Sequence, residues 1–128
     1  MRAKEMILLT AGLASLIVGS SSLAHHGRAS YTNETITLQA TVTEFRFINP
    51  HVQIYFDIKN DAGETEAWQG ELTAPNKLAR GGWTKQTLQP GDEIVITGRA
   101  GRNRGHSVAI NEIIMPDGAP IPLWEVLD

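Results

Sequence analysis

The sequence predicts an all-β protein with one short helix, arranged as an OB-like fold: a five-stranded, partly open barrel with the helix between strands 3 and 4. Five segments after residue 34 alternate apolar and polar residues, which is the period of a half-buried strand. The alternation changes phase inside the first segment, and a helix-like pattern occurs between the third and fourth. This combination matches the OB-fold. The alternative is a small β-sandwich with one surface helix.

The first predicted strand starts at Thr35 and carries the phase change. Its two alternating sets are Ile36, Leu38, Ala40 and Val42 on one side and Phe45 and Phe47 on the other. Because an inserted residue moves the following side chains to the opposite face, we expect a β-bulge near Thr43 and Glu44. Asn49-Pro50 is expected to end the strand, since proline restricts the backbone of the residue before it.

The second and third predicted strands form a hairpin. The second covers residues 51–59, and the side chains expected to face inward are Val52, Ile54, Phe56 and Ile58. Residues 60–63 (Asn-Asp-Ala-Gly) have the composition of a hairpin turn. The third strand covers residues 64–72.

The period then becomes helical. Thr73 is expected to N-cap a helix that has Pro75 in its first turn and stops at Gly81-Gly82. Residues 84–88 are a candidate for one further helical turn.

Two more strands, residues 93–100 and 106–115, complete the predicted barrel, and a turn leads to a short final strand near Leu123 and Trp124. The three tryptophans, Trp68, Trp83 and Trp124, are expected to be structural. There are no internal repeats, so residues 35–128 are expected to form one domain.

The N-terminal segment has the features of a signal peptide. Arg2 and Lys4 precede a short apolar run at residues 6–18, and Ser22 and Ala24 are the small residues of a cleavage site. The run is shorter than the ~20 residues that span a membrane. We therefore expect cleavage after Ala24, a periplasmic or secreted location, a mature chain without a transmembrane segment, and a flexible arm at residues 25–34.

Composition narrows the expected chemistry. The chain has no cysteine, which excludes disulfides and cysteine metal ligands. Removing Arg2, Lys4 and Glu5 from 11 basic and 14 acidic residues leaves 9 and 13. This acidic balance argues against nucleic acid as a partner. No common catalytic motif occurs, so no catalytic residue is predicted and a non-enzymatic role is favoured.

Four histidines follow the predicted cleavage site: His25, His26, His51 and His106. OB-folds bind ligands with strands 2 and 3 and with the loops between strands 1 and 2 and between strands 4 and 5. His51 follows the first loop and His106 the second. The two histidines are therefore expected either to meet at one mouth of the barrel or to be unrelated surface residues.

An N-terminal His25 predicts a copper site. Its α-amine and ring Nδ1 can chelate one metal ion after losing their protons. An imidazole from His26 or His51 would complete the three-nitrogen arrangement called a histidine brace, and such ligands suit Cu(II) best. His106 is a weaker candidate. The alternative is a polar terminus that captures cations adventitiously. A further alternative is a copper-dependent redox protein, which would need the same brace and one open coordination position on the copper ion.

A basic loop offers a metal-free alternative. Arg99, Arg102 and Arg104, in a segment that also contains glycines, could hold a phosphate, carboxylate or sugar acid, or they form a solvated hairpin tip. If the loop holds an anion, the protein would be a metal-free module of the cell envelope that binds an anionic small molecule, a glycan or a protein partner. Nucleic acid is not expected, because exposed aromatic residues are sparse.

Several motifs together resemble a known family. They are Ala24-His25-His26-Gly27, Asn49-Pro50-His51, Arg80-Gly81-Gly82-Trp83 and Leu88-x-Pro90-Gly91-Asp92. The chain resembles domain-of-unknown-function family 6152, whose members are small exported bacterial proteins that typically begin with His-His after cleavage. The family has no established activity. The resemblance implies that His25, His26 and His51 are the positions that match its histidine motifs, whereas His106 matches none.

Overall fold

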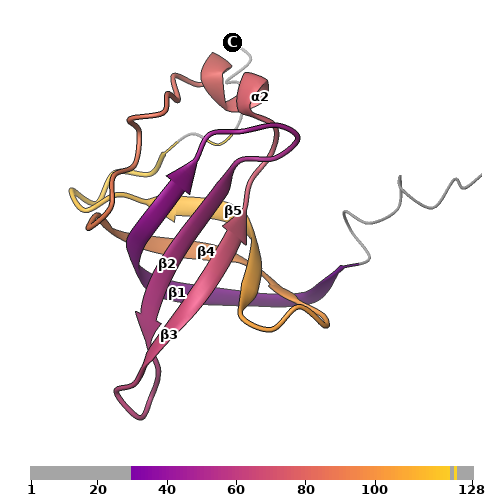
Figure 1. The fold of residues 1–128 in the computed structure, drawn as a ribbon, viewed down its shortest axis with the longest axis vertical. Coiled ribbons are helices and arrows are strands. Elements are labelled where there is room, and N and C mark those ends of the chain that lie inside the picture. The colour runs from indigo at the N-terminus through magenta and orange to yellow at the C-terminus, as the bar shows by residue number, and fades with distance from the viewer. Residues whose placement is uncertain (1–29, 122, 124–128) are drawn as a thin grey trace, which may run out of the picture.

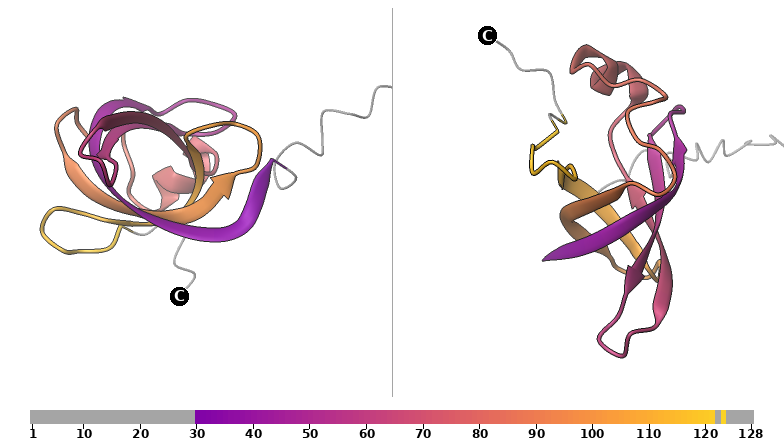
Figure 2. Two further views of the ribbon diagram at one scale, coloured as in Figure 1. Left: turned by 90° about the horizontal axis from the view of Figure 1, so that it is seen from below. Right: turned by 90° about the vertical axis from the view of Figure 1, so that its left-hand side faces the viewer.

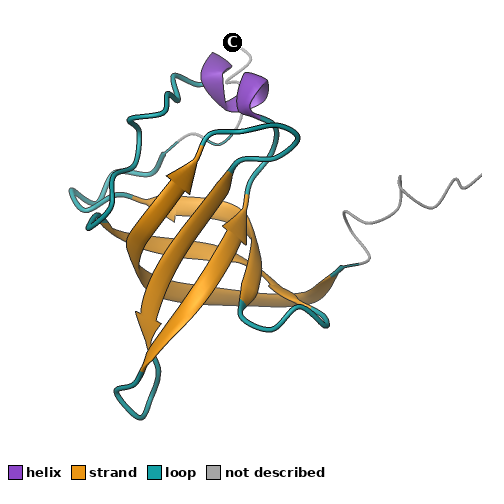
Figure 3. Ribbon diagram, viewed as in Figure 1, coloured by secondary structure: helices purple, strands orange, loops and turns teal. Residues whose placement is uncertain are grey.

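A computed structural model describes residues 30–121 and 123 and shows a mostly β protein with one short helix. Figures 1 and 3 show its elements, which in chain order are β1 (Tyr31–Arg46), β2 (Gln53–Lys59), β3 (Thr65–Glu71), α2 (Pro75–Arg80), β4 (Glu93–Gly101) and β5 (Ser107–Ile114). The OB-like prediction is confirmed in strand number and in the position of the helix between β3 and β4.

The strands form one barrel in the order β1-β2-β3-β5-β4, and β4 pairs back with β1. The ring is visible in Figure 2 (left). All neighbours are antiparallel except β3 and β5, which pair in parallel through Gln69–Ser107, Gly70–Val108 and Glu71–Ala109. This short ladder is the seam of the barrel, and it places the end of β3 beside the start of β5.

β1 is the longest strand and pairs with two neighbours along its length. Its first part pairs with β4 and its last part with β2, and the register shifts between Val42 and Glu44. This confirms the predicted bulge. β1 begins at Tyr31, earlier than the predicted Thr35, because Tyr31 pairs with Gly101 of β4. Residues 31–34 therefore belong to the barrel, and residues 1–29 lie outside the described residues.

Apolar side chains from all five strands fill the barrel, and α2 covers one end (Figure 1). Phe56 and Ile54 of β2 are fully buried at the centre. Leu78 of α2 and Leu88 of the following segment are also buried, so the connection between β3 and β4 closes this end. The β2–β3 hairpin projects from the opposite end (Figure 1).

Two local predictions differ from the structure. Ala74, not Thr73, is the N-cap of α2, and it makes no side-chain capping bond. Pro75 does open the helix, because its fixed φ suits the first turn. Residues 84–88 form a turn rather than a helix, with the Thr87 N–H donating to the Thr84 carbonyl at 3.2 Å. After β5, Pro120 forms an isolated bridge with Ile114, and Trp124 lies outside the described residues.

The described residues contain no helix long and apolar enough to cross a membrane.

Candidate functional site

The candidate site lies on the outer surface of the barrel, where β3 ends at Glu71. The neighbouring Gly70 faces the barrel interior, where a Cβ would lie 2.5 Å from Ile110 Cδ1. Successive residues of a strand face opposite sides, so Glu71 points outward. Its strand partners are Gln53 in β2 and Ala109 in β5.

Four side chains from separate parts of the chain meet here, and we call them the Glu71 cluster: Tyr31, His51, Glu71 and Arg104. His51 Nδ1 contacts Glu71 Oε1, and the Tyr31 hydroxyl donates to Glu71 Oε2 at 2.8 Å. Arg104 Nη1 lies 3.9 Å from Glu71 Oε2 and donates to the Tyr31 hydroxyl oxygen at 3.5 Å. One carboxylate therefore joins the start of β1, the β1–β2 loop and the β4–β5 loop.

Tyr31 is buried, with 5% of its surface exposed, although it is not part of the barrel's core cluster. The Arg104 guanidinium carbon lies 5.9 Å from the centre of the Tyr31 ring. Burial, followed by the hydrogen bond to Glu71 and the Glu71 charge, raises the pKa of Tyr31 to about 12, and Arg104 opposes this shift. The phenol therefore stays protonated at neutral pH and acts as a donor to Glu71.

This pKa predicts a loss of stability at high pH. Below pH 10 Tyr31 is neutral in both the folded and the unfolded chain, so it adds no pH dependence. As pH rises from 10 towards 12, the unfolded chain loses this proton while the folded chain retains it. The free energy of unfolding should then fall by roughly 2–3 kcal/mol.

The Tyr55→Phe variant provides the measurement, because Tyr31 is then the only tyrosine of the chain. Its ultraviolet absorbance should show ionisation near pH 12 or together with unfolding, as followed by circular dichroism. Ionisation near pH 10 in a chain that is still folded would contradict the buried, hydrogen-bonded position of Tyr31.

His51 is held by one ring nitrogen and presents the other. An ionised carboxylate only accepts hydrogen bonds, so the neutral His51 ring must carry its proton on Nδ1 to bond to Glu71. This leaves the lone pair of Nε2 available. The His51 side chain is 46% exposed, so Nε2 can accept a bond from a ligand or metal ion.

The structure does not bring His106 to His51. The His106 ring stacks on Trp68, with centroids 5.0 Å apart and planes 8° apart, and its Nε2 lies 3.5 Å from Glu66 Oε2. Glu66 and Glu71 are five residues apart on β3, which is about 17 Å along a strand. Of the two alternatives, the structure therefore favours the second, two unrelated surface histidines. The β4–β5 loop residue that lies near Glu71, the partner of His51, is Arg104.

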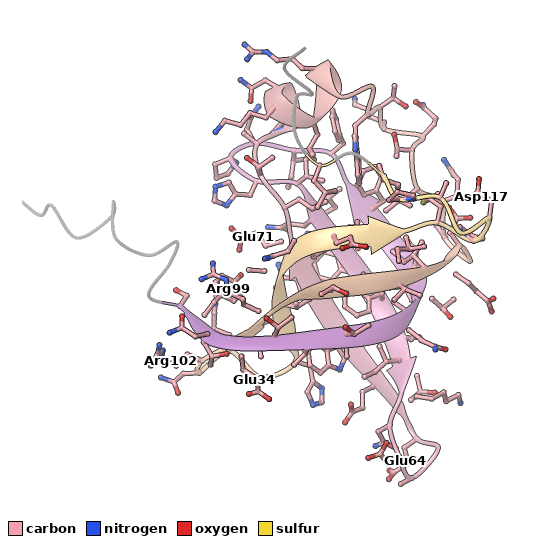
Figure 4. All side chains as sticks on the ribbon, turned by 180° about the vertical axis from the view of Figure 1, so that it is seen from behind. Glu34, Glu64, Glu71, Arg99, Arg102 and Asp117 are labelled. Carbon is pink, nitrogen blue, oxygen red and sulfur yellow. The ribbon has the colours of Figure 1, made fainter. Side chains whose placement is uncertain are left out.

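The three arginines of the basic loop make different contacts. The Arg102 N–H donates to the Ser30 carbonyl at 2.8 Å, and its guanidinium donates to the Tyr31 carbonyl at 3.4 Å. Arg104 belongs to the Glu71 cluster. Arg99 is on β4 and pairs with Ala109 of β5. Ala109 also pairs with Glu71 of β3, so Arg99, Ala109 and Glu71 lie side by side on three adjacent strands. Figure 4 shows Glu71, Arg99 and Arg102 on the side where β1 begins. The loop is thus tied to the start of β1 and is not a free hairpin tip.

A surface groove of about 1100 Å³ lies elsewhere. It runs between the β2–β3 hairpin and the turn after β5, and it contains none of the four residues of the Glu71 cluster. The cluster itself is an open surface site. Such a site suits an ion or a chain terminus better than a small molecule that must be enclosed.

The described part of the chain does not provide three metal ligands by itself. Residues 30–121 and 123 contain no group of three His, Cys, Asp or Glu side chains that could hold a metal ion. His51 offers one nitrogen. His25 and His26 lie outside the described residues, so any brace would have to add ligands from there.

Glu71 and Tyr31 are the residues that sequence reasoning missed. Glu71 could have been found, because the hairpin turn at residues 60–63 pairs Gln53 with Glu71 and so brings His51 close to it. Tyr31 carried no comparable signal. It lies within the N-terminal arm expected at residues 25–34, and its contact with Glu71 depends on closure of the whole barrel.

A family described as "Family of unknown function (DUF6152)" matches residues 13–109, a range that includes His25, His26 and all four residues of the Glu71 cluster. No curated protein matches the chain.

Proposed function

The chain belongs to DUF6152, a family of unknown function, and we propose that it is an exported, non-enzymatic module that binds copper between an N-terminal His25 and His51. Export rests on the signal-peptide features of residues 1–24. The copper site rests on the chemistry of the two histidines and on where the chain enters the barrel.

The ligand set consists of nitrogen atoms. After cleavage behind Ala24, His25 would provide its α-amine and Nδ1, and His51 would provide Nε2. Three nitrogens in a tetragonal arrangement favour Cu(II) over other common divalent ions. His26 is the alternative third ligand, and it competes with His51 in this proposal.

The single observation that carries the proposal is the position of Tyr31. Its hydroxyl lies 2.8 Å from Glu71 Oε2, and the other Glu71 oxygen contacts His51. His25 precedes Tyr31 by six residues, and six residues of extended chain reach at most about 21 Å. The chain therefore enters the barrel beside His51, and a short arm is long enough for His25 to meet it.

The test is a titration of the mature protein with Cu(II). Intact mass first establishes that His25 is the first residue. We expect one tightly bound Cu(II) per chain, thermal stabilisation that increases with Cu(II) concentration, and reversal by a chelator. Two control variants are His25→Ala and a chain with one alanine added before His25, which separates the α-amine from the imidazole. Weak or non-stoichiometric uptake, or equal binding by these variants, would contradict the proposal.

One observation favours a second candidate, a metal-free module for an anionic ligand. Among the described residues, the half-buried Arg99 side chain has no hydrogen-bond or ion-pair partner. A guanidinium in this position can accept a carboxylate or phosphate. In that case a small anion such as inorganic phosphate would stabilise the wild type but not Arg99→Ala, and a chelator would have no effect.

A further inference from the structure

We infer that Glu71 is a positioning residue for His51: it holds the imidazole so that Nε2 is the free nitrogen, and Tyr31 and Arg104 hold Glu71 in turn. This inference rests on the proposed function for its purpose, which is to present Nε2 to copper. It is a separate claim about the metal-free protein.

The first step is that the two oxygens of the Glu71 carboxylate contact different residues. Oε1 contacts His51 and Oε2 accepts the Tyr31 hydroxyl, while Arg104 lies 3.9 Å from Oε2. Each oxygen thus has its own partner. The Glu71 side chain is 24% exposed, so most of its surface is held by protein groups rather than by water.

The second step concerns the proton on the His51 ring. A neutral imidazole carries one proton, on either Nδ1 or Nε2, and the nitrogen without it is the potential metal ligand. A carboxylate beside Nδ1 stabilises the form with the proton on Nδ1. Metal-binding histidines commonly donate their second nitrogen to a carboxylate in this way, which fixes both tautomer and ring orientation.

The third step is the anchoring of Glu71. Tyr31 is buried and stays protonated, so its hydroxyl is a permanent donor to Oε2. Glu71 is therefore fixed from the side opposite His51, and its orientation is passed on to the imidazole.

The same strand contains a matched control. Glu66 also places a carboxylate against a histidine, but Glu66 Oε2 lies 3.5 Å from Nε2 of His106, and Glu66 Oε1 accepts from the Trp68 indole at 3.4 Å. A general effect of removing negative charge from β3 would be equal at both positions. A specific effect on His51 would follow only from Glu71.

The experiment measures the tautomer of His51 by nitrogen NMR of the metal-free mature protein, at a pH where the ring is neutral. We expect the proton on Nδ1 in the wild type and in Glu66→Ala, and a shift towards the form with the proton on Nε2 in Glu71→Ala. Glu71→Gln keeps an acceptor oxygen and should retain the wild-type tautomer. Tyr31→Phe, which removes the anchoring donor, should give an intermediate result.

Copper affinity provides the second measurement. Glu71→Ala should bind Cu(II) about 10- to 100-fold more weakly than the wild type, the usual effect of losing such a partner, while Glu66→Ala binds as the wild type does. An unchanged His51 tautomer in Glu71→Ala would overturn the inference, whether or not copper binds. If Glu71→Ala shifts the His51 tautomer but the wild type binds no copper, the proposed function is overturned and the positioning role of Glu71 is supported.

Discussion

Replacing His51 with alanine is expected to weaken Cu(II) binding by the mature protein by more than about 100-fold. Even loss of an outer partner of a metal ligand costs about 10- to 100-fold, and His51→Ala removes the ligand itself. The α-amine and imidazole of His25 would remain, so residual binding through two nitrogens is expected. Isothermal titration or competition with a chelator of known affinity measures the difference.

His106→Ala is the matched control for this prediction. His106 is similarly exposed, with 50% of its side chain accessible against 46% for His51, and it also contacts a carboxylate of β3. Its ring stacks on Trp68 and its carboxylate partner is Glu66, whereas His51 contacts Glu71, so the two histidines belong to separate groups of side chains. Its replacement should leave Cu(II) affinity unchanged, and an equal loss in both variants would show that neither histidine is a specific ligand.

Replacing Gly98 with alanine is expected to cost about 3 kcal/mol of unfolding free energy, at the upper end of the usual range for overpacking. A Cβ at Gly98 would lie 2.1 Å from the Ala109 carbonyl oxygen and 2.8 Å from Val108 Cγ2. The register of β4 and β5 shifts at this point, between Thr97 and Gly98. Because the closest obstacle is backbone, relief requires the two strands to move apart. Urea unfolding with an unchanged slope measures the loss.

Gly70→Ala is the control for Gly98→Ala. A Cβ at Gly70 would meet Ile110 Cδ1 at 2.5 Å, but this atom is the end of a flexible side chain that can rotate away. We therefore expect a smaller loss than at Gly98. If Gly98→Ala were as stable as Gly70→Ala, the close approach of β4 and β5 described here would be incorrect.

The fold follows from local features that the sequence displays openly. Alternation along Val52, Ile54 and Phe56 identifies a strand with one buried face, and all three are fully buried. The phase change near Thr43 and Glu44 identifies the bulge. The helix cap is less predictable, because Thr73, two residues before Pro75, is a typical N-cap residue, and only the backbone conformation shows that Ala74 is the N-cap.

The candidate site is less local, and this explains what sequence reasoning missed. Tyr31 and Glu71 are 40 residues apart, and Tyr31 and Arg104 are 73 apart. Their contacts require β4 to pair with β1 and β5 to pair with β3. The start of β1 lies at the opposite end of that strand from the loop with His51, but closure of the barrel brings the Tyr31 side chain to the same carboxylate. The position of His106 after the β4–β5 loop left two alternatives open, and its ring packs on Trp68 rather than meeting His51.

The measurement that tests the central claim most directly is electron paramagnetic resonance of the one-copper complex of the mature protein, compared with that of His51→Ala. A site shared by His25 and His51 predicts a tetragonal Cu(II) spectrum with coupling to three nitrogens in the wild type. It also predicts the loss of one of these couplings in His51→Ala and no change in His106→Ala. A wild-type spectrum that is identical to that of His51→Ala would contradict the account.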